Sequence, residues 1–173
     1  MYMNSVTIRL AGYADAQDMA EIHMRSWEAA YSSIIPADYI NEKNATRSAL
    51  WERVLSAENT TQYAIEKDGR IAGFLGMGVS RDDDLDDNCF ELFAIYLHPE
   101  YYRQGVGTSA MEFVCDKARS EGKSMITVWV LAENISSVKF YEKCGFSADG
   151  KTQEMDYGRT MRCIRMRKAL QVI

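Results

Sequence analysis

The stretch that decides the fold runs from Phe90 to Thr108 and reads FELFAIYLHPEYYRQGVGT. Its first part, Phe90–Leu97, is a strongly apolar run typical of a buried strand. Its last part carries Gly105 and Gly107 at the start of a helix expected at Gly107–Arg119. A helix N-terminus exposes unpaired N–H groups, and glycine lets an anion approach the backbone closely. The stretch therefore predicts a strand, a phosphate-binding loop and a helix in succession.

Further elements lie on both sides of this unit. Strands are expected at Val6–Leu10, Tyr63–Glu66, Ile71–Val79, Met125–Leu131, Phe146–Ala148 and Thr160–Lys168. A first helix is expected to begin after Asp15, which caps it, with Met19 to Ala30 along one face. A second is expected at Thr46–Ser56, with Leu50, Val54 and Leu55 inward, and a third at Ser136–Lys143. Loops or turns are expected at Pro36–Ile40, Asp149-Gly150 and Gly158.

This order of elements predicts one α/β (α+β) domain over residues 1–173. Hairpins and a single β-α-β crossover give a mixed, mostly antiparallel central sheet of about six to seven strands flanked by about four helices.

The composition also points to one folded domain. The chain has 173 residues, of which 47% are hydrophobic and 26% charged, so a disordered chain is excluded. No run approaches the roughly 18 apolar residues of a membrane helix, and the N-terminal segment Met1–Ser5 lacks the features of a signal peptide. A formal net charge of −5 argues against binding nucleic acid through bulk electrostatics. We therefore expect a cytoplasmic protein without nucleic-acid or membrane partners.

Potential metal ligands form no recognisable pattern. The four cysteines are far apart in the chain: Cys89, Cys115, Cys144 and Cys163. His23 and His98 have no partner at ligand spacing. The aspartates between Asp82 and Asp87 miss the Gly and Glu positions of a calcium loop. We expect no metal, and we expect these aspartates to form a solvated loop that repulsion keeps extended, with attraction of a cationic substrate as the alternative.

The glycine loop fits a second chemistry less well. Gly105 to Ala110 matches the G-x-G-x-x-G/A dinucleotide fingerprint, and Glu133 could serve as the ribose-binding acid. However, the seven residues His98–Gln104 separate the strand from the first glycine, where the fingerprint requires an immediate turn. A Rossmann-type dinucleotide enzyme is therefore a minor alternative.

Two further motifs follow the glycine loop. Ala132-Glu133-Asn134 comes after the next strand, and Phe-Tyr-x-x-x-Gly-Phe begins at Phe140. With the stretch from Glu91 onward, this series resembles the GNAT superfamily of acetyl-CoA-dependent N-acetyltransferases, most strongly from Glu91 to Phe146. One position departs from the family loop Q/R-x-x-G-x-G/A, because Tyr102 stands at its first place with Arg103 beside it.

The resemblance implies that acetyl-CoA is the cosubstrate. The strands Phe90–Leu97 and Met125–Leu131 would splay apart at their C-terminal ends and hold pantetheine between them. The residues implied in binding acetyl-CoA are Ile95, Tyr96, Leu97, Arg103, Gln104, Gly105, Val106, Gly107, Thr108 and Asn134.

The resemblance also implies direct transfer of the acetyl group to a primary amine. Tyr141 is the candidate general acid, since a phenol with a pKa of about 10 keeps its proton at neutral pH. Glu91 is the candidate base, through water; strand alternation would place it on one face with Phe93, Ile95 and Leu97. A backbone N–H near Ile95 is a candidate oxyanion donor. Trp27 and Tyr31 would line the acceptor pocket, together with Ile34, Ile35, Tyr39 and the stretch from Met155 to Met161.

The identity of the acceptor stays open at this stage. A small-molecule amine, a peptide N-terminus, a lysine and an antibiotic amine all fit, and so does a longer acyl-CoA as donor. The alternative function keeps the fold but not the chemistry, as an acyl-CoA-binding sensor or regulatory module without turnover. A homodimer is a family-level expectation.

Overall fold

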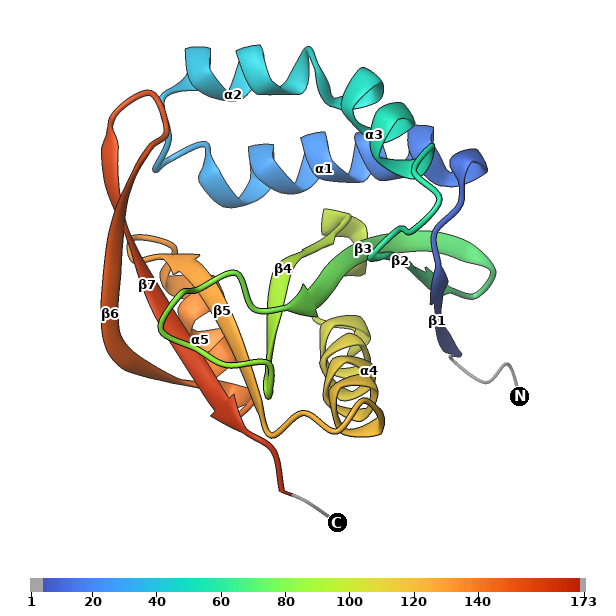
Figure 1. Ribbon diagram of the computed structural model, residues 1–173. Coiled ribbons are helices and arrows are strands. Elements are labelled where there is room, and N and C mark those ends of the chain that lie inside the picture. Colours follow the sequence, from blue (N-terminus) through green and yellow to red (C-terminus); the bar gives the residue numbers. More distant parts are fainter. Residues whose placement is uncertain (1–4, 172–173) are drawn as a thin grey trace.

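The computed structural model describes residues 5–171, so the N-terminal segment Met1–Ser5 lies outside the described residues except for Ser5 (Figure 1). Seven strands form one sheet in the order β1-β2-β3-β4-β5-β7-β6. Their bounds are β1 Val6–Leu10, β2 Gln62–Lys67, β3 Arg70–Val79, β4 Cys89–Leu97, β5 Met125–Leu131, β6 Ser147–Asp156 and β7 Thr160–Ala169. Only β4 and β5 run parallel. The mixed, mostly antiparallel sheet is therefore confirmed.

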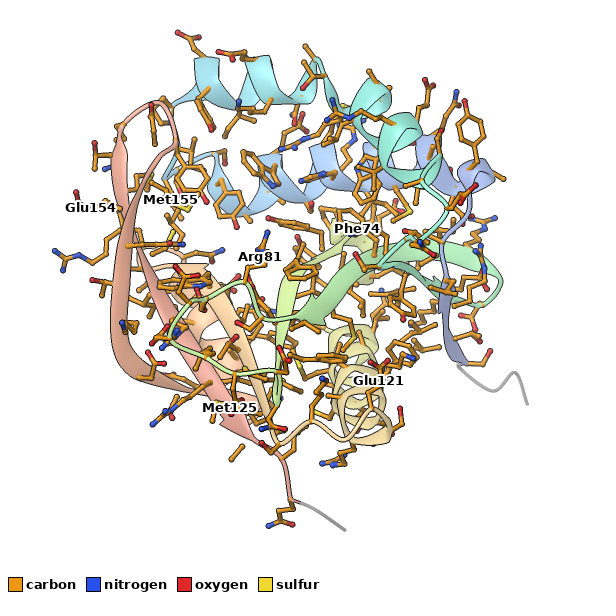
Figure 2. All side chains as sticks on the ribbon, viewed as in Figure 1. Phe74, Arg81, Glu121, Met125, Glu154 and Met155 are labelled. Carbon is orange, nitrogen blue, oxygen red and sulfur yellow. The ribbon has the colours of Figure 1, made fainter. Side chains whose placement is uncertain are left out.

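Helices cover both faces of the sheet. Their bounds are α1 Ala16–Tyr31, α2 Ala37–Asn44, α3 Arg47–Leu55, α4 Val106–Ser120 and α5 Ile135–Lys143, with 3₁₀ turns η1 Tyr13–Asp15 and η2 Pro99–Tyr101. Figure 1 shows α1, α2 and α3 together on one side and α4 on the other. Each side encloses an apolar core, with α4 and α5 over one cluster and α1 and α3 over a second that contains Phe74 (Figure 2). Within the described residues no helix is long and apolar enough to cross a membrane.

Two local predictions are wrong and one is right only in part. The segment Pro36–Ile40, expected as a loop or turn, leads into α2, because Pro36 takes the N-cap position and Ile40 is buried on the inner face. Asp15 takes the predicted N-cap position of α1, but its side chain does not cap the helix; its carboxylate accepts hydrogen bonds from the Gly12 backbone and from Arg9. The pair Asp149-Gly150 lies within β6 as a register shift, rather than between strands.

A bulge in β4 changes which side chains share a face. Gly76 pairs with Ala94 and Met77 with Leu92, so Phe93 is an extra residue in the strand. Consequently Leu92 and Ile95 both pack on the α4 side, and the alternation inverts between them. Glu91 therefore shares its face with Ala94 and Tyr96, under α1, rather than with Ile95 and Leu97 as predicted. The regular alternation failed here because a bulge depends on pairing with β3.

The two parallel strands at the centre of the sheet diverge. β4 and β5 pair over only four positions, from Cys89 with Met125 to Leu92 with Val128. Beyond them β4 keeps its partners in β3 and β5 keeps its partners in β7. The C-terminal halves of β4 and β5 therefore face an opening, as predicted.

Candidate active site

A cavity of about 840 Å³ occupies the opening between β4 and β5. Its walls come from α1, β4, the loop before α4, β5, α5 and β6. Arg81 and Met155, labelled in Figure 2, are among the lining side chains. Of the predicted residues, those that line it are Trp27, Tyr31, Glu91, Ile95, Tyr96, Leu97, Arg103, Gly105, Gly107, Thr108, Asn134 and Tyr141.

The loop before α4 forms one end of this cavity. Gly105 is the N-cap of α4 in the left-handed conformation (φ 79°), and no side chain caps the helix. A Cβ at Gly105 would meet nothing within 4 Å, so the space over the loop is open. The free N–H groups and the helix dipole favour a phosphate here.

Gln104 and Val106 do not line the cavity. The Gln104 side chain donates to the Glu100 carbonyl and accepts from Lys67, and Val106 is fully buried in the core beside α4. Any contribution of these two residues to a phosphate site would come from their backbone.

Tyr141 and Asn134 border the cavity from α5. Tyr141 is 7% exposed, with the rings of Phe140 and Phe146 at 5.5 and 5.7 Å. Burial, more than the nearby Tyr96 and Cys144, raises the pKa of the Tyr141 phenol well above its usual value. The hydroxyl therefore keeps its proton at physiological pH. Asn134 caps α5, where its Oδ1 accepts the Ser137 N–H at 3.1 Å.

Glu91 enters the cavity as one half of an ion pair. Its carboxylate accepts from Arg81 Nη2 at 2.6 Å, Arg81 Nε at 3.2 Å and the Arg81 backbone N–H at 3.0 Å. The Glu91 residue is only 2% exposed, whereas the Arg81 side chain is 68% exposed and stacks on the ring of Phe93. Hydrogen bonds between charged partners of this kind are stronger than those between neutral groups. Arg81 was not predicted from the sequence, because its contact with Glu91 forms only when the chain turns after β3 and β4 pairs beside it.

Aromatic rings form another wall of the cavity. Trp27 lies 5.2 Å from Tyr31 and 6.3 Å from Tyr157 between ring centroids. Burial, with a smaller effect of Tyr96, raises the pKa of Tyr31 well above 10. Tyr157 and Met155 reach the cavity from the last hairpin, as the sequence predicted for that segment. Ile34, Ile35 and Tyr39 pack in the adjoining apolar cluster instead.

The acidic loop after β3 is held by cations. Arg165, whose side chain is 4% exposed, contacts Asp82 at 3.1 Å, Asp84 at 2.8 Å and Asp149 at 2.8 Å. Lys151 adds a contact to Asp84, and the indole N–H of Trp129 donates to Asp82. Asp83, Asp84, Asp86 and Asp87 are exposed, as expected for a solvated loop. The expectation that repulsion keeps the loop extended is wrong, because Asp82 and Asp84 already have counterions.

Comparisons with known proteins give a consistent result. The family model described as "Acetyltransferase (GNAT) family" matches residues 16–146. The N-acetyltransferase YuaI of Bacillus subtilis, itself uncharacterized, is 34% identical over 137 residues, 79% of this chain and 78% of that protein. The [ribosomal protein bS18]-alanine N-acetyltransferase of Escherichia coli is 27% identical over 116 residues, 65% of this chain and 74% of that protein. The structure of the PaiA N-acetyltransferase of Thermoplasma acidophilum in complex with coenzyme A superposes with a TM-score of 0.70 at 25% identity, covering 95% of this chain and 99% of that one.

Proposed function

The chain belongs to the GNAT family of acetyltransferases, and on that premise we propose that it moves the acetyl group of acetyl-CoA directly onto the primary amine of a small molecule or peptide, with Tyr141 as general acid and Glu91 as base. The observation that carries the proposal is that Tyr141 and Glu91 line one cavity, located where β4 and β5 diverge. The relative from Escherichia coli acts on an alanine of a ribosomal protein, so an amine of an amino acid or of a peptide end is a fitting acceptor class.

The residues present fit acetyl-CoA as the cosubstrate. The pyrophosphate fits the open N-terminus of α4, where Arg103 adds a positive charge and Gly105 leaves the approach clear. The pantetheine arm fits the free edge of β4 at Ile95 to Leu97, since these residues have β3 on one side and the cavity on the other. The thioester then lies between Tyr141 and Glu91.

The side chains move two protons in the reaction. Glu91 accepts a proton of the amine, through a water molecule, as the amine nitrogen bonds to the thioester carbon. Tyr141 gives its proton to the sulfur as the carbon–sulfur bond breaks, so that the products are an amide and the free thiol of CoA. Because burial raises the pKa of Tyr141, the phenol carries its proton at physiological pH and can serve as the donor. A backbone N–H near Ile95 is the proposed oxyanion donor.

Free-thiol release from acetyl-CoA over a panel of amines tests the proposal. We expect Tyr141→Phe to lower kcat by about tenfold or more while the KM for acetyl-CoA changes little, because only the proton donor is lost. We expect Glu91→Gln to remove the acidic limb of the pH–rate profile.

Tyr13→Phe is the matched control for the acid, because Tyr13 is 60% exposed and does not line the cavity. Unchanged turnover in Tyr141→Phe would exclude the acid role, and a pH–rate profile unchanged in Glu91→Gln would exclude the base. Acetyl-CoA binding without thiol release on any amine of the panel would favour the sensor alternative.

A further inference from the structure

Arg47 is a buried arginine with free hydrogen-bond donors. It is the first residue of α3 and is 6% exposed. Its Nε and Nη2 atoms are buried and have no hydrogen-bond partner among the described residues. Buried charges in proteins are normally paired, because an unpaired charge away from water is strongly unfavourable. The environment of Arg47 therefore lacks an acceptor that its chemistry requires.

The helix geometry directs Arg47 toward Trp27, which lines the cavity, although Arg47 itself does not line it. Arg47, Trp51 and Leu55 recur every four residues and form the buried face of α3. The Arg47 guanidinium carbon lies 4.4 Å from the centre of the Trp27 ring, and Trp27 lines the cavity. The Trp27 Nε1 atom is also buried without a partner. Three N–H donors without acceptors thus meet beside the cavity.

No negative charge within the described residues compensates Arg47. Burial lowers the pKa of Arg47, and the groups that oppose this shift are two phenols, Tyr96 and Tyr39, rather than carboxylates. Burial, together with the charge of Arg47, lowers the pKa of His23 to about 3. His23 is therefore neutral and offers no compensation either.

The free edge of Arg47 matches a carboxylate. Nε and Nη2 share one edge of the planar guanidinium group and point two N–H groups in one direction within its plane, which suits the two oxygens of a carboxylate. The chain itself uses this edge in Arg81, whose Nε and Nη2 contact the two oxygens of Glu91 at 3.2 and 2.6 Å. Arg47 presents the same edge with no carboxylate on it.

We propose that Arg47 binds the carboxylate of the amine acceptor, so that the preferred acceptors are free amino acids and related amino carboxylates. The inference rests on the proposed function, because it assigns the acceptor for the same cavity. Arg47 supplies the bidentate contact and Trp27 Nε1 a third donor. The free edge is closed to solvent in this structure, so the carboxylate reaches it when the Trp27 ring or the Arg47 side chain turns toward the cavity.

The first test compares the 20 standard amino acids with their primary amides as acceptors, by thiol release from acetyl-CoA. The amide keeps the amine and the side chain but removes the negative charge. We expect kcat/KM for the best acids to exceed that of the matching amides by about tenfold or more. Arg47→Gln lowers the values for the acids by a similar factor and leaves the amides and the KM for acetyl-CoA nearly unchanged. Arg47→Lys, which keeps the charge without the fork, gives an intermediate result.

Arg53→Gln is the matched control, because Arg53 is an exposed arginine of the same helix. It keeps the preference of the wild-type enzyme for acids. Equal use of acids and amides by the wild-type enzyme, or an unchanged preference in Arg47→Gln, overturns the inference. The wild-type comparison decides the matter even if Arg47→Gln does not fold.

A second readout separates this inference from the proposed function. Thermal unfolding is measured with each amino acid or amide and without acetyl-CoA. We expect the acids, but not the amides, to raise the melting temperature of the wild-type protein, and to leave that of Arg47→Gln unchanged. A shift with acids but no thiol release supports the carboxylate site and contradicts the transferase proposal. Thiol release from amides as fast as from acids, with no rise in melting temperature, supports the transferase proposal and contradicts the carboxylate site.

Discussion

His23 shows how a single buried side chain links the core to the cavity. Its ring stacks on Tyr96 at 5.0 Å between centroids and accepts a hydrogen bond from the Trp51 indole at Nδ1, 3.2 Å away. Burial is the main cause, and Arg47 the second, of a pKa lowered to about 3. The folded protein therefore holds His23 neutral, whereas the unfolded chain protonates it near pH 6.5.

This difference predicts a loss of stability in mild acid. Because the pKa of His23 is lower in the folded protein than in the unfolded chain, protonation favours the unfolded chain. The free energy of unfolding is therefore unaffected by His23 above pH 6.5 and decreases as the pH falls toward 3. Between pH 7.5 and 5, His23 alone should lower the free energy of unfolding by about 2 kcal/mol. Urea denaturation at both pH values measures it. His23→Asn, which keeps an acceptor for Trp51, should flatten the pH dependence by that amount, whereas His98→Asn should not. If the free energy of unfolding depended equally on pH in the wild-type protein and both variants, His23 would not be the cause of the acid sensitivity.

Glycines at the two ends of α4 allow the role of the loop in binding phosphate to be separated from the effect of backbone strain on stability. Gly105 precedes the helix at φ 79° and Gly122 follows it at φ 72°, and a Cβ at either would meet nothing within 4 Å. Gly105→Ala and Gly122→Ala should each cost about 1–2 kcal/mol in stability, because alanine disfavours this conformation. Only Gly105→Ala should also weaken acetyl-CoA binding, by about tenfold or more, since Gly105 belongs to the loop that lines the cavity and Gly122 does not. Calorimetric titration measures both variants, and equal binding by the two would show that the loop does not hold the cofactor.

Elements whose signal is local were predictable from the sequence. The run Met125–Leu131 is β5 itself, and the apolar stripe of α4, including Met111 and Val114, is buried as its periodicity indicated. The bulge at Phe93 was not predictable, because it arises from the register of β4 against β3. The inward face of α3 was predicted only in part: Leu55 is buried as expected, but Arg47 was missed, because an arginine is typical of an exposed face.

The same distinction applies to the candidate site. Tyr141 and Asn134 belong to a local motif, and the motif placed them on the helix that borders the cavity. Arg81 and Arg47 have no local motif. The first acts through an ion pair across a chain bend, and the second through the contact between α3 and α1. Such pairings are set by tertiary packing, so periodicity does not reveal them.

On the scale of the whole molecule, the sheet consists of two parts joined by a short ladder. β1 to β4 form one part and β5 to β7 the other, and four residue pairs between β4 and β5 connect them. The edge strands are β1 and β6, and the homodimer suggested by family resemblance stays a prediction. A ligand that fills the opening contacts both parts at once, as the residues from β4, β5 and α5 around the cavity indicate.

Acetyl-CoA should therefore couple the two parts of the sheet. At about 100 times its Kd, a ligand specific for the folded state adds about 2.7 kcal/mol to the free energy of unfolding. Hydrogen–deuterium exchange should show the largest local protection at Ile95–Leu97 and Trp129–Leu131, on the two sides of the opening, and at the loop from Arg103 to Thr108. Val6–Leu10 in the distant edge strand should change only as much as global stability requires. Protection confined to one strand would mean that the ligand lies on that strand alone, and that the divergence of β4 and β5 does not form the binding site.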